Sequence, residues 1–155
     1  MCESCRSQPG YHSFQHIADV SGQQYFYCFP AHNKQSVRTH QDMLNFASHF
    51  PSEGQWNLLF HARGYGMSHM MPLPIALELG RIVQEQHKMR LQKIYVIEGS
   101  WFMQFLLRCI LPFLQKDMKE KFVSVQGSPL EIVTFLRLEG LSYKQLQCLR
   151  DKFEA

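Results

Sequence analysis

The sequence lacks an apolar run long enough to cross a bilayer. The longest such run, residues 101–114, is interrupted by Gln104, Arg108 and Pro112, and it is shorter than the about 20 residues that a membrane-spanning helix needs. The opening residues, MCESCRSQPG, lack the apolar segment of a secretory signal. We therefore expect a cytoplasmic protein that is either free in solution or peripheral to membranes.

Charge of one sign is not concentrated anywhere in the sequence. The 16 Lys and Arg residues are scattered through both halves, and the formal net charge is +3. Nucleic-acid-binding domains gather such residues into a patch or a stripe, so nucleic acid is not an expected partner. Four basic residues either contact an acidic membrane surface or form the solvated sides of ordinary helices: Arg81, Lys88, Arg90 and Lys93.

No internal repeat, low-complexity tract or linker divides the sequence, and its 155 residues suit one domain. We expect that domain over residues 17–155, after a short extension formed by residues 1–16. The sequence has 5 cysteines, an odd number, and Cys28, Cys109 and Cys148 lie within apolar or helical patterns. Cysteines in such places behave as small hydrophobes, which predicts reduced thiols.

Patterns typical of strands and of helices alternate along the chain. Residues 16–31 predict a hairpin that turns at Ser21-Gly22. Further strands are expected to begin near residues 55, 93 and 122, and helices are expected within residues 37–50, 74–92, 101–115, 128–140 and 142–155. This alternation predicts an α/β fold, a sheet covered by helices, and the hairpin predicts that the sheet is mixed rather than wholly parallel.

The expected helix over residues 101–115 is apolar on nearly every side. Its polar or helix-breaking residues share one narrow stripe: Gln104, Arg108, Pro112 and Gln115. Such a helix is expected to be covered on more than one side. A sheet covers one flank, so the other must meet a second helix, a partner protein or an apolar ligand. Pro112 is expected to kink or end the helix.

The order of these segments resembles that of CRAL/TRIO domains, which carry single apolar lipids between membranes. Four stretches carry the resemblance: KIYVI, an apolar helix with ILPFL, KFVSV, and PLEIVTFLRLEGLSYKQL. WNLLFHARG and YFYCF resemble the first strands of the family. The closing LRLEGLS and last amphipathic helix are most similar to the divergent branch found beside Rho GTPase-activating modules and in neurofibromin-like proteins. Gly99-Ser100 and Leu111 depart from the family, which usually has a proline and a basic residue there.

The resemblance implies a cavity with the sheet as its floor and helices as its wall and gate. It implies pocket residues on the apolar helix and on two central strands: Phe102, Phe105, Leu106, Cys109 and Phe113, opposite Leu58 and Phe60 or Tyr95 and Ile97. Both faces of the strands look buried, so the choice between the two strand pairs stays open. The sequence lacks the N-terminal helical lobe of the lipid-transfer members of the family, which leaves open a closed domain that binds proteins.

The leading hypothesis is therefore a non-enzymatic domain that binds a lipid or another apolar ligand reversibly. Its rival is a ligand-free scaffold for protein partners such as a small-GTPase regulator. An enzyme is not expected, because the sequence has no phosphate loop or nucleophile elbow. Cys28 or Cys109 with His61 is a conceivable nucleophile and base, but nothing in the sequence brings an orienting carboxylate to them.

The first 16 residues contain a pattern of metal-ligand types. Cys2, Cys5, His12 and His16 form C-x-x-C followed by H-x-x-x-H, with end spacings that suit tetrahedral zinc. The gap between the two pairs is shorter than in a zinc finger of the Cys₂His₂ type. The sequence leaves open a zinc ion at the N-terminus, hence a zinc-stabilised adaptor, and an incidental grouping in a frayed terminus.

Overall fold

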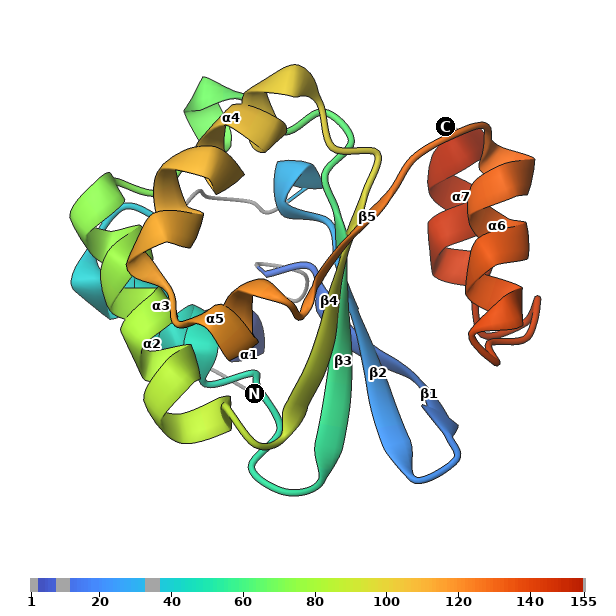
Figure 1. Cartoon of the computed structure of the whole chain (residues 1–155), viewed down its shortest axis with the longest axis horizontal. Helices are drawn as coiled ribbons and strands as arrows, with labels where there is room; N and C mark the ends of the chain where they lie inside the picture. Colours follow the sequence, from blue (N-terminus) through green and yellow to red (C-terminus); the bar gives the residue numbers. More distant parts are fainter. Residues whose placement is uncertain (1–2, 8–11, 33–36, 155) are drawn as a thin grey trace.

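The apolar runs of the sequence form one sheet with helices on both faces (Figure 1). The computed structural model describes residues 3–7, 12–32 and 37–154. Within them the strands are β1 Phe14–Val20, β2 Gln23–Cys28, β3 Gln55–His61, β4 Leu91–Ile97 and β5 Phe122–Val125, and they lie side by side in chain order. β1 is antiparallel to β2, and the other neighbouring pairs are parallel. The predicted mixed α/β fold is therefore confirmed.

The hairpin of β1 and β2 turns where the sequence predicts. Ser21 and Gly22 both have positive φ angles, 51° and 79°. A two-residue hairpin turn with positive φ at both positions matches the right-handed twist of the strands that it joins. The turn therefore sets the antiparallel edge of a sheet that is otherwise parallel.

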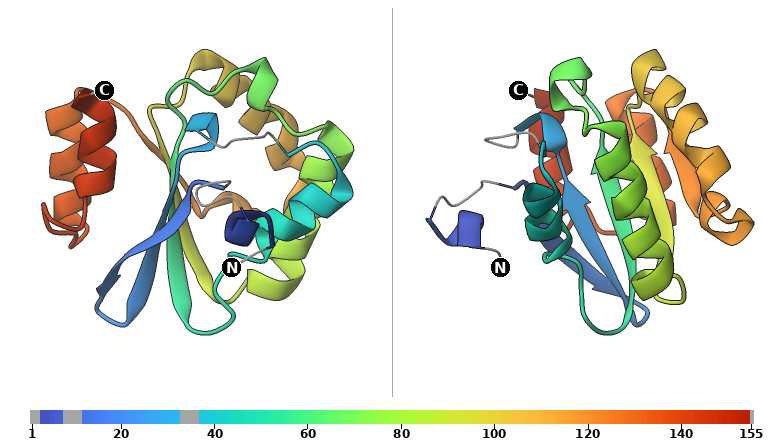
Figure 2. Two further views of the ribbon diagram at one scale, coloured as in Figure 1. Left: turned by 180° about the vertical axis from the view of Figure 1, so that it is seen from behind. Right: turned by 90° about the vertical axis from the view of Figure 1, so that its left-hand side faces the viewer.

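Helices cover the two faces of the sheet in two separate groups (Figures 1 and 2). The face covered by α2 His40–Ala47, α3 Leu73–His87, α4 Trp101–Ile110 and α5 Lys116–Lys119 is called the front face here. The back face is covered by α6 Pro129–Leu138 and α7 Gln147–Glu154. The short helical segments are α1 Glu3–Ser7, η1 Pro30–His32, η2 Met67–His69 and η3 Leu111–Phe113.

The back face holds a closed apolar core. Leu59 and Ile97 of the sheet pack there with Ile132 and Leu136 of α6 and with Leu149 of α7, and each of these side chains is fully buried. The N-terminus of α6 is fixed by Ser128, whose hydroxyl accepts from the Glu131 N–H. This side of the sheet is closely packed.

Helix α4 is covered on one side and exposed on the other. It begins after Ser100, whose hydroxyl accepts from the Met103 N–H, and it ends at Ile110 before the turn that contains Pro112, as predicted. Met103 is its buried residue, whereas Trp101 is 80% and Phe105 is 55% exposed. Within the described residues the outer side of α4 is therefore exposed, and its cover by a partner protein or an apolar ligand stays a prediction. No helix in the described ranges is both long and apolar enough to cross a membrane.

Candidate functional site

A cavity of about 270 Å³ lies between the front face of the sheet and its helices. Successive side chains of a strand point to opposite faces. Leu58 and Phe60 of β3 and Ile94 and Val96 of β4 point to the front, and they form the floor of the cavity. The wall comes from the helices and from the residues that follow them, and it includes Phe46, Phe50, Leu79, Val83, Met103 and Leu107.

The lining of this cavity is almost wholly apolar. None of the described residues that line it is Asp, Glu, Lys or Arg, and polar side-chain atoms come from Trp56, Tyr65 and His69. Trp56 is 1% exposed, and in the described part of the chain its Nε1–H has no hydrogen-bond partner. A buried donor without a partner is uncommon and destabilises a fold by about 1–3 kcal/mol. One residue of the apolar lining, Trp56, therefore carries a buried donor that is unsatisfied.

The structure distributes the residues predicted for the pocket over three places. Leu58, Phe60 and Leu106 line the cavity. Tyr95 and Ile97 belong to the core behind the sheet, because they alternate along β4 with the residues that face the cavity. Four residues predicted on the apolar helix are not among those that line the cavity: Phe102, Phe105, Cys109 and Phe113.

The orientation of α4 explains this distribution. Met103, Leu106, Leu107 and Ile110 face the cavity at spacings of three, four and seven residues from Met103, as one face of a helix requires. The inward face of α4 could not be identified from the sequence, because the other faces of this helix are equally apolar. The contribution of α3 was also missed, although its Ala76, Leu79 and Val83 carry the helical period that marks an inward face.

A second group of polar side chains lies behind the sheet. Tyr27 Oη donates to His61 Nδ1 at 2.7 Å, and His61 Nε2 donates to Glu98 Oε2 at 2.6 Å. Burial lowers the pKa of His61, although the hydrogen bond to Glu98 acts to raise it. Both ring nitrogens of His61 are thus engaged. Cys28 packs in the front core and Cys109 is exposed on α4, so neither thiol belongs to this network.

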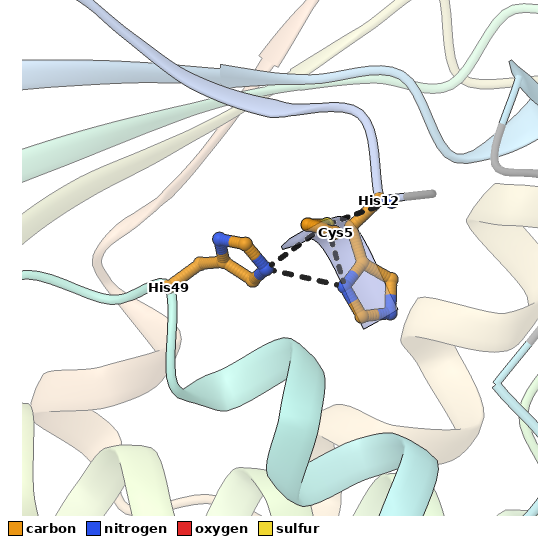
Figure 3. Close-up of side chains that lie close together, drawn as sticks. All are labelled: Cys5, His12 and His49. Atoms are coloured by element: carbon orange, nitrogen blue, oxygen red, sulfur yellow. Dashed lines mark hydrogen bonds between the residues drawn. The ribbon is translucent and has the colours of Figure 1, made fainter. Parts of the chain in front are cut away.

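A third group joins the N-terminal segment to the turn after α2 (Figure 3). Cys5 Sγ lies 3.7 Å from His12 Nδ1 and 3.5 Å from His49 Nε2, and the two nitrogens are 3.2 Å apart. Burial and the charge of His49 lower the pKa of His12 to about 4, and burial lowers the pKa of His49. Both imidazoles therefore stay neutral at pH 7 and keep a lone pair. The three residues could hold a metal ion.

This group overlaps only partly with the predicted ligand set. Cys5 and His12 are brought together, and Cys2 lies outside the described residues. His16 is directed elsewhere: its Nε2 lies 2.9 Å from the Asp19 carboxylate on the exposed side of β1. His49 was missed, because it follows His12 by 37 residues and no short spacing connects them.

Comparison with known proteins gives one match to a family. The sequence profile of the CRAL/TRIO domain matches residues 9–139. That span contains all the strands of the sheet described above and the helices that line the cavity. A search of curated proteins gives no match.

Proposed function

The chain belongs to the CRAL/TRIO domain family, and from this premise we propose that it binds a lipid or another apolar small molecule in the cavity on the front face of its sheet. The observation that carries the proposal is the uncharged lining of that cavity. Ligand sites of proteins are mostly apolar, with a few polar groups that fix orientation. The family itself suggests a lipophilic ligand.

The apolar surface of the cavity supports occupation by a ligand. The cavity is partly open, so water reaches its apolar lining when no ligand is bound. An apolar ligand would cover this surface, and each Å² of apolar surface taken from water would contribute about 25 cal/mol. We expect the ligand-bound chain to be more stable than the empty one.

Trp56 supports a ligand that carries one hydrogen-bond acceptor. Trp56 lines the cavity and its indole N–H is buried without a partner, so an ester, carboxyl or hydroxyl oxygen that reaches it would satisfy it. An amphipathic lipid has such an oxygen next to its hydrocarbon chain. The proposal therefore favours an oxygen-bearing lipid over a pure hydrocarbon.

The outer side of α4 supports contact with a membrane surface. Trp101 is 80%, Phe105 is 55% and Phe113 is 64% exposed, and the exposed Arg108 lies among them in the sequence. Apolar side chains beside a basic one suit the boundary between headgroups and acyl chains. We propose that this surface meets the bilayer from which the ligand is taken. Docking of a protein partner, such as a small-GTPase regulator, is the alternative.

The proposal contains no enzymatic step. Both nitrogens of His61 are occupied, and burial raises the pKa of the Cys28 thiol, which opposes formation of a nucleophilic thiolate. Binding and release of the ligand need no covalent chemistry.

Native mass spectrometry of the freshly purified full chain tests the proposal. We expect an added mass in the range of a lipid that is absent from the denatured spectrum of the same sample, and solvent extraction should recover it. Incubation of the extracted chain with mixed lipid vesicles should restore it. A bare mass that stays bare after incubation would contradict lipid binding and favour the protein scaffold.

A further inference from the structure

The three ligand atoms of Cys5, His12 and His49 are arranged like one face of a zinc tetrahedron. Zinc binds thiolate sulfur at about 2.3 Å and imidazole nitrogen at about 2.0–2.1 Å, so tetrahedral angles separate S from N by about 3.6 Å and N from N by about 3.3 Å. The two S–N distances here are 3.7 and 3.5 Å, and the N–N distance is 3.2 Å. One zinc ion placed to one side of the plane of these three atoms would lie at bonding distance from all of them.

We propose that Cys5 Sγ, His12 Nδ1 and His49 Nε2 bind one zinc ion. Cys5 binds as the thiolate and gives its proton to the solvent, and the two imidazoles bind through their lone pairs. The fourth position of the tetrahedron is not supplied by these three residues. Cys2, outside the described residues, precedes Cys5 with the C-x-x-C spacing of structural zinc sites.

The chemistry of the group selects zinc over the common hard cations. It offers one sulfur and two nitrogens and no carboxylate, whereas Mg²⁺ and Ca²⁺ take oxygen ligands. The backbone N–H of His12 donates to Cys5 Sγ at 3.4 Å, and such a donor stabilises a thiolate and orients it. Cys5 is 6% and His12 is 4% exposed, so the solvent has little access to these two ligands.

The position of the site gives it a structural role. α1 has five residues, which is too short for a helix to be stable alone, and His12 and His49 stand before β1 and after α2. Zinc would therefore fasten α1 and the end of α2 to the first strand. The His12 ring also meets the Phe46 ring edge-on at a centroid distance of 5.7 Å, so the site stands directly behind the wall of the cavity.

Metal titration of the full chain, produced without a polyhistidine tag and kept reduced, tests this proposal. The chain is delipidated, stripped of metal with a chelator and titrated with zinc chloride, and bound metal and melting temperature are measured. We expect one zinc per chain and a higher melting temperature. His49→Gln should weaken binding by more than the about 10–100-fold that loss of an outer-shell partner causes. His16→Gln is the matched control and should bind zinc as the parent chain does.

Cobalt(II) chloride gives a readout that does not depend on any variant. A thiolate-to-cobalt absorption band and strong visible bands of tetrahedral cobalt are expected, and zinc should abolish them. Absence of the thiolate band, or equal zinc affinity of the parent chain and His49→Gln, would overturn the proposal. Because metal is measured on lipid-free protein, this outcome is independent of whether the cavity binds a lipid.

Discussion

The two faces of the sheet use alternate residues of the same strands, but they are filled differently. On the back face Leu136, Leu146 and Leu149 are 0% exposed and close the space over the strands. On the front face Leu58 and Phe60 meet a cavity of about 270 Å³. One side of the sheet is thus closely packed, while the other side keeps room for a ligand.

Helices α4 and α6 show the same contrast, since each has ten residues and a mostly apolar sequence. α6 buries Ile132, Val133 and Leu136 against the sheet, whereas α4 buries Met103. The composition of α4 is not that of a core helix with a solvated side. The apolar ligand proposed on one side of α4 and the membrane contact proposed on the other would account for it.

The largest expected effect is a difference in the stability lost when a leucine is truncated on one face of the sheet or on the other. Leu136→Ala leaves a hole in the closed core and should lower the free energy of unfolding by about 2–5 kcal/mol. Leu106→Ala borders a space that already exists, and we expect less than half of that loss in the ligand-free chain. Urea unfolding of both variants measures the difference. Equal losses would mean that the front face is packed as tightly as the back.

The outer surface of α4 provides the next effect. Trp101→Ala removes a large side chain whose burial in a bilayer would contribute about 1.5–3 kcal/mol, so vesicle binding should weaken about tenfold or more. Sedimentation with anionic vesicles measures it. Leu138→Ala, on α6, is the control, because Leu138 is 83% exposed on the opposite side of the sheet. Unchanged sedimentation of the Trp101 variant would favour a protein partner for this surface.

Acid should destabilise the fold partly through His61. Two histidine–carboxylate pairs were described above, and in the His61–Glu98 pair the histidine is buried. Its folded pKa is lowered from the usual 6.5 by burial, with Arg63 and Lys152 adding to the effect and Glu98 opposing it. Because the pKa of His61 is lower in the folded chain, His61 makes a contribution to stability that is fully present above pH 6.5. This contribution is lost as the pH falls through the folded pKa. Each tenfold weakening of proton binding in the folded state corresponds to about 1.4 kcal/mol of this stability.

Urea unfolding between pH 7 and pH 4 measures this loss. His61→Gln should make the pH dependence shallower, because the group that must accept a proton is gone. His16→Gln removes the exposed pair with Asp19 and should leave the dependence unaltered. A parent chain that gains stability on acidification would contradict the account.

The smallest expected effect concerns the donor of Trp56. Trp56→Phe removes the N–H and keeps an aromatic ring, so affinity for an oxygen-bearing lipid should fall by up to about tenfold, the equivalent of one hydrogen bond. Affinity for a hydrocarbon of equal chain length should not fall. Calorimetric titration of both ligands compares them. Equal losses of affinity for the two ligands would show that the shape of the ring, and not the N–H donor, determines binding.

The sequence predicted the elements of this fold well, because their signals are local. Period-two and period-three-to-four patterns mark strands and helices, and Ser21-Gly22 and Pro112 mark a turn and a helix end. The start of α2 was misplaced by three residues. Thr39 and Asp42 form a reciprocal capping box that begins the helix at His40 rather than near residue 37.

The candidate sites were less predictable, because they depend on choices that local patterns do not encode. Leu58, Leu59 and Phe60 are all apolar, so alternation could not say which side of β3 faces the cavity. The same holds for the faces of α4. His49 joins Cys5 through the fold, across 44 residues of sequence, and no motif spacing points to it.

The central claim is that the cavity on the front face is the place where an apolar ligand binds. Leu106→Trp should fill it from α4, and Leu138→Trp makes the same substitution on an exposed residue of α6. The direct measurement is titration of the delipidated chain and both variants with a fluorescent fatty-acid analogue. Saturable binding by the parent chain and Leu138→Trp, with loss in Leu106→Trp, is the predicted result. Equal binding by a folded Leu106→Trp chain would contradict the claim.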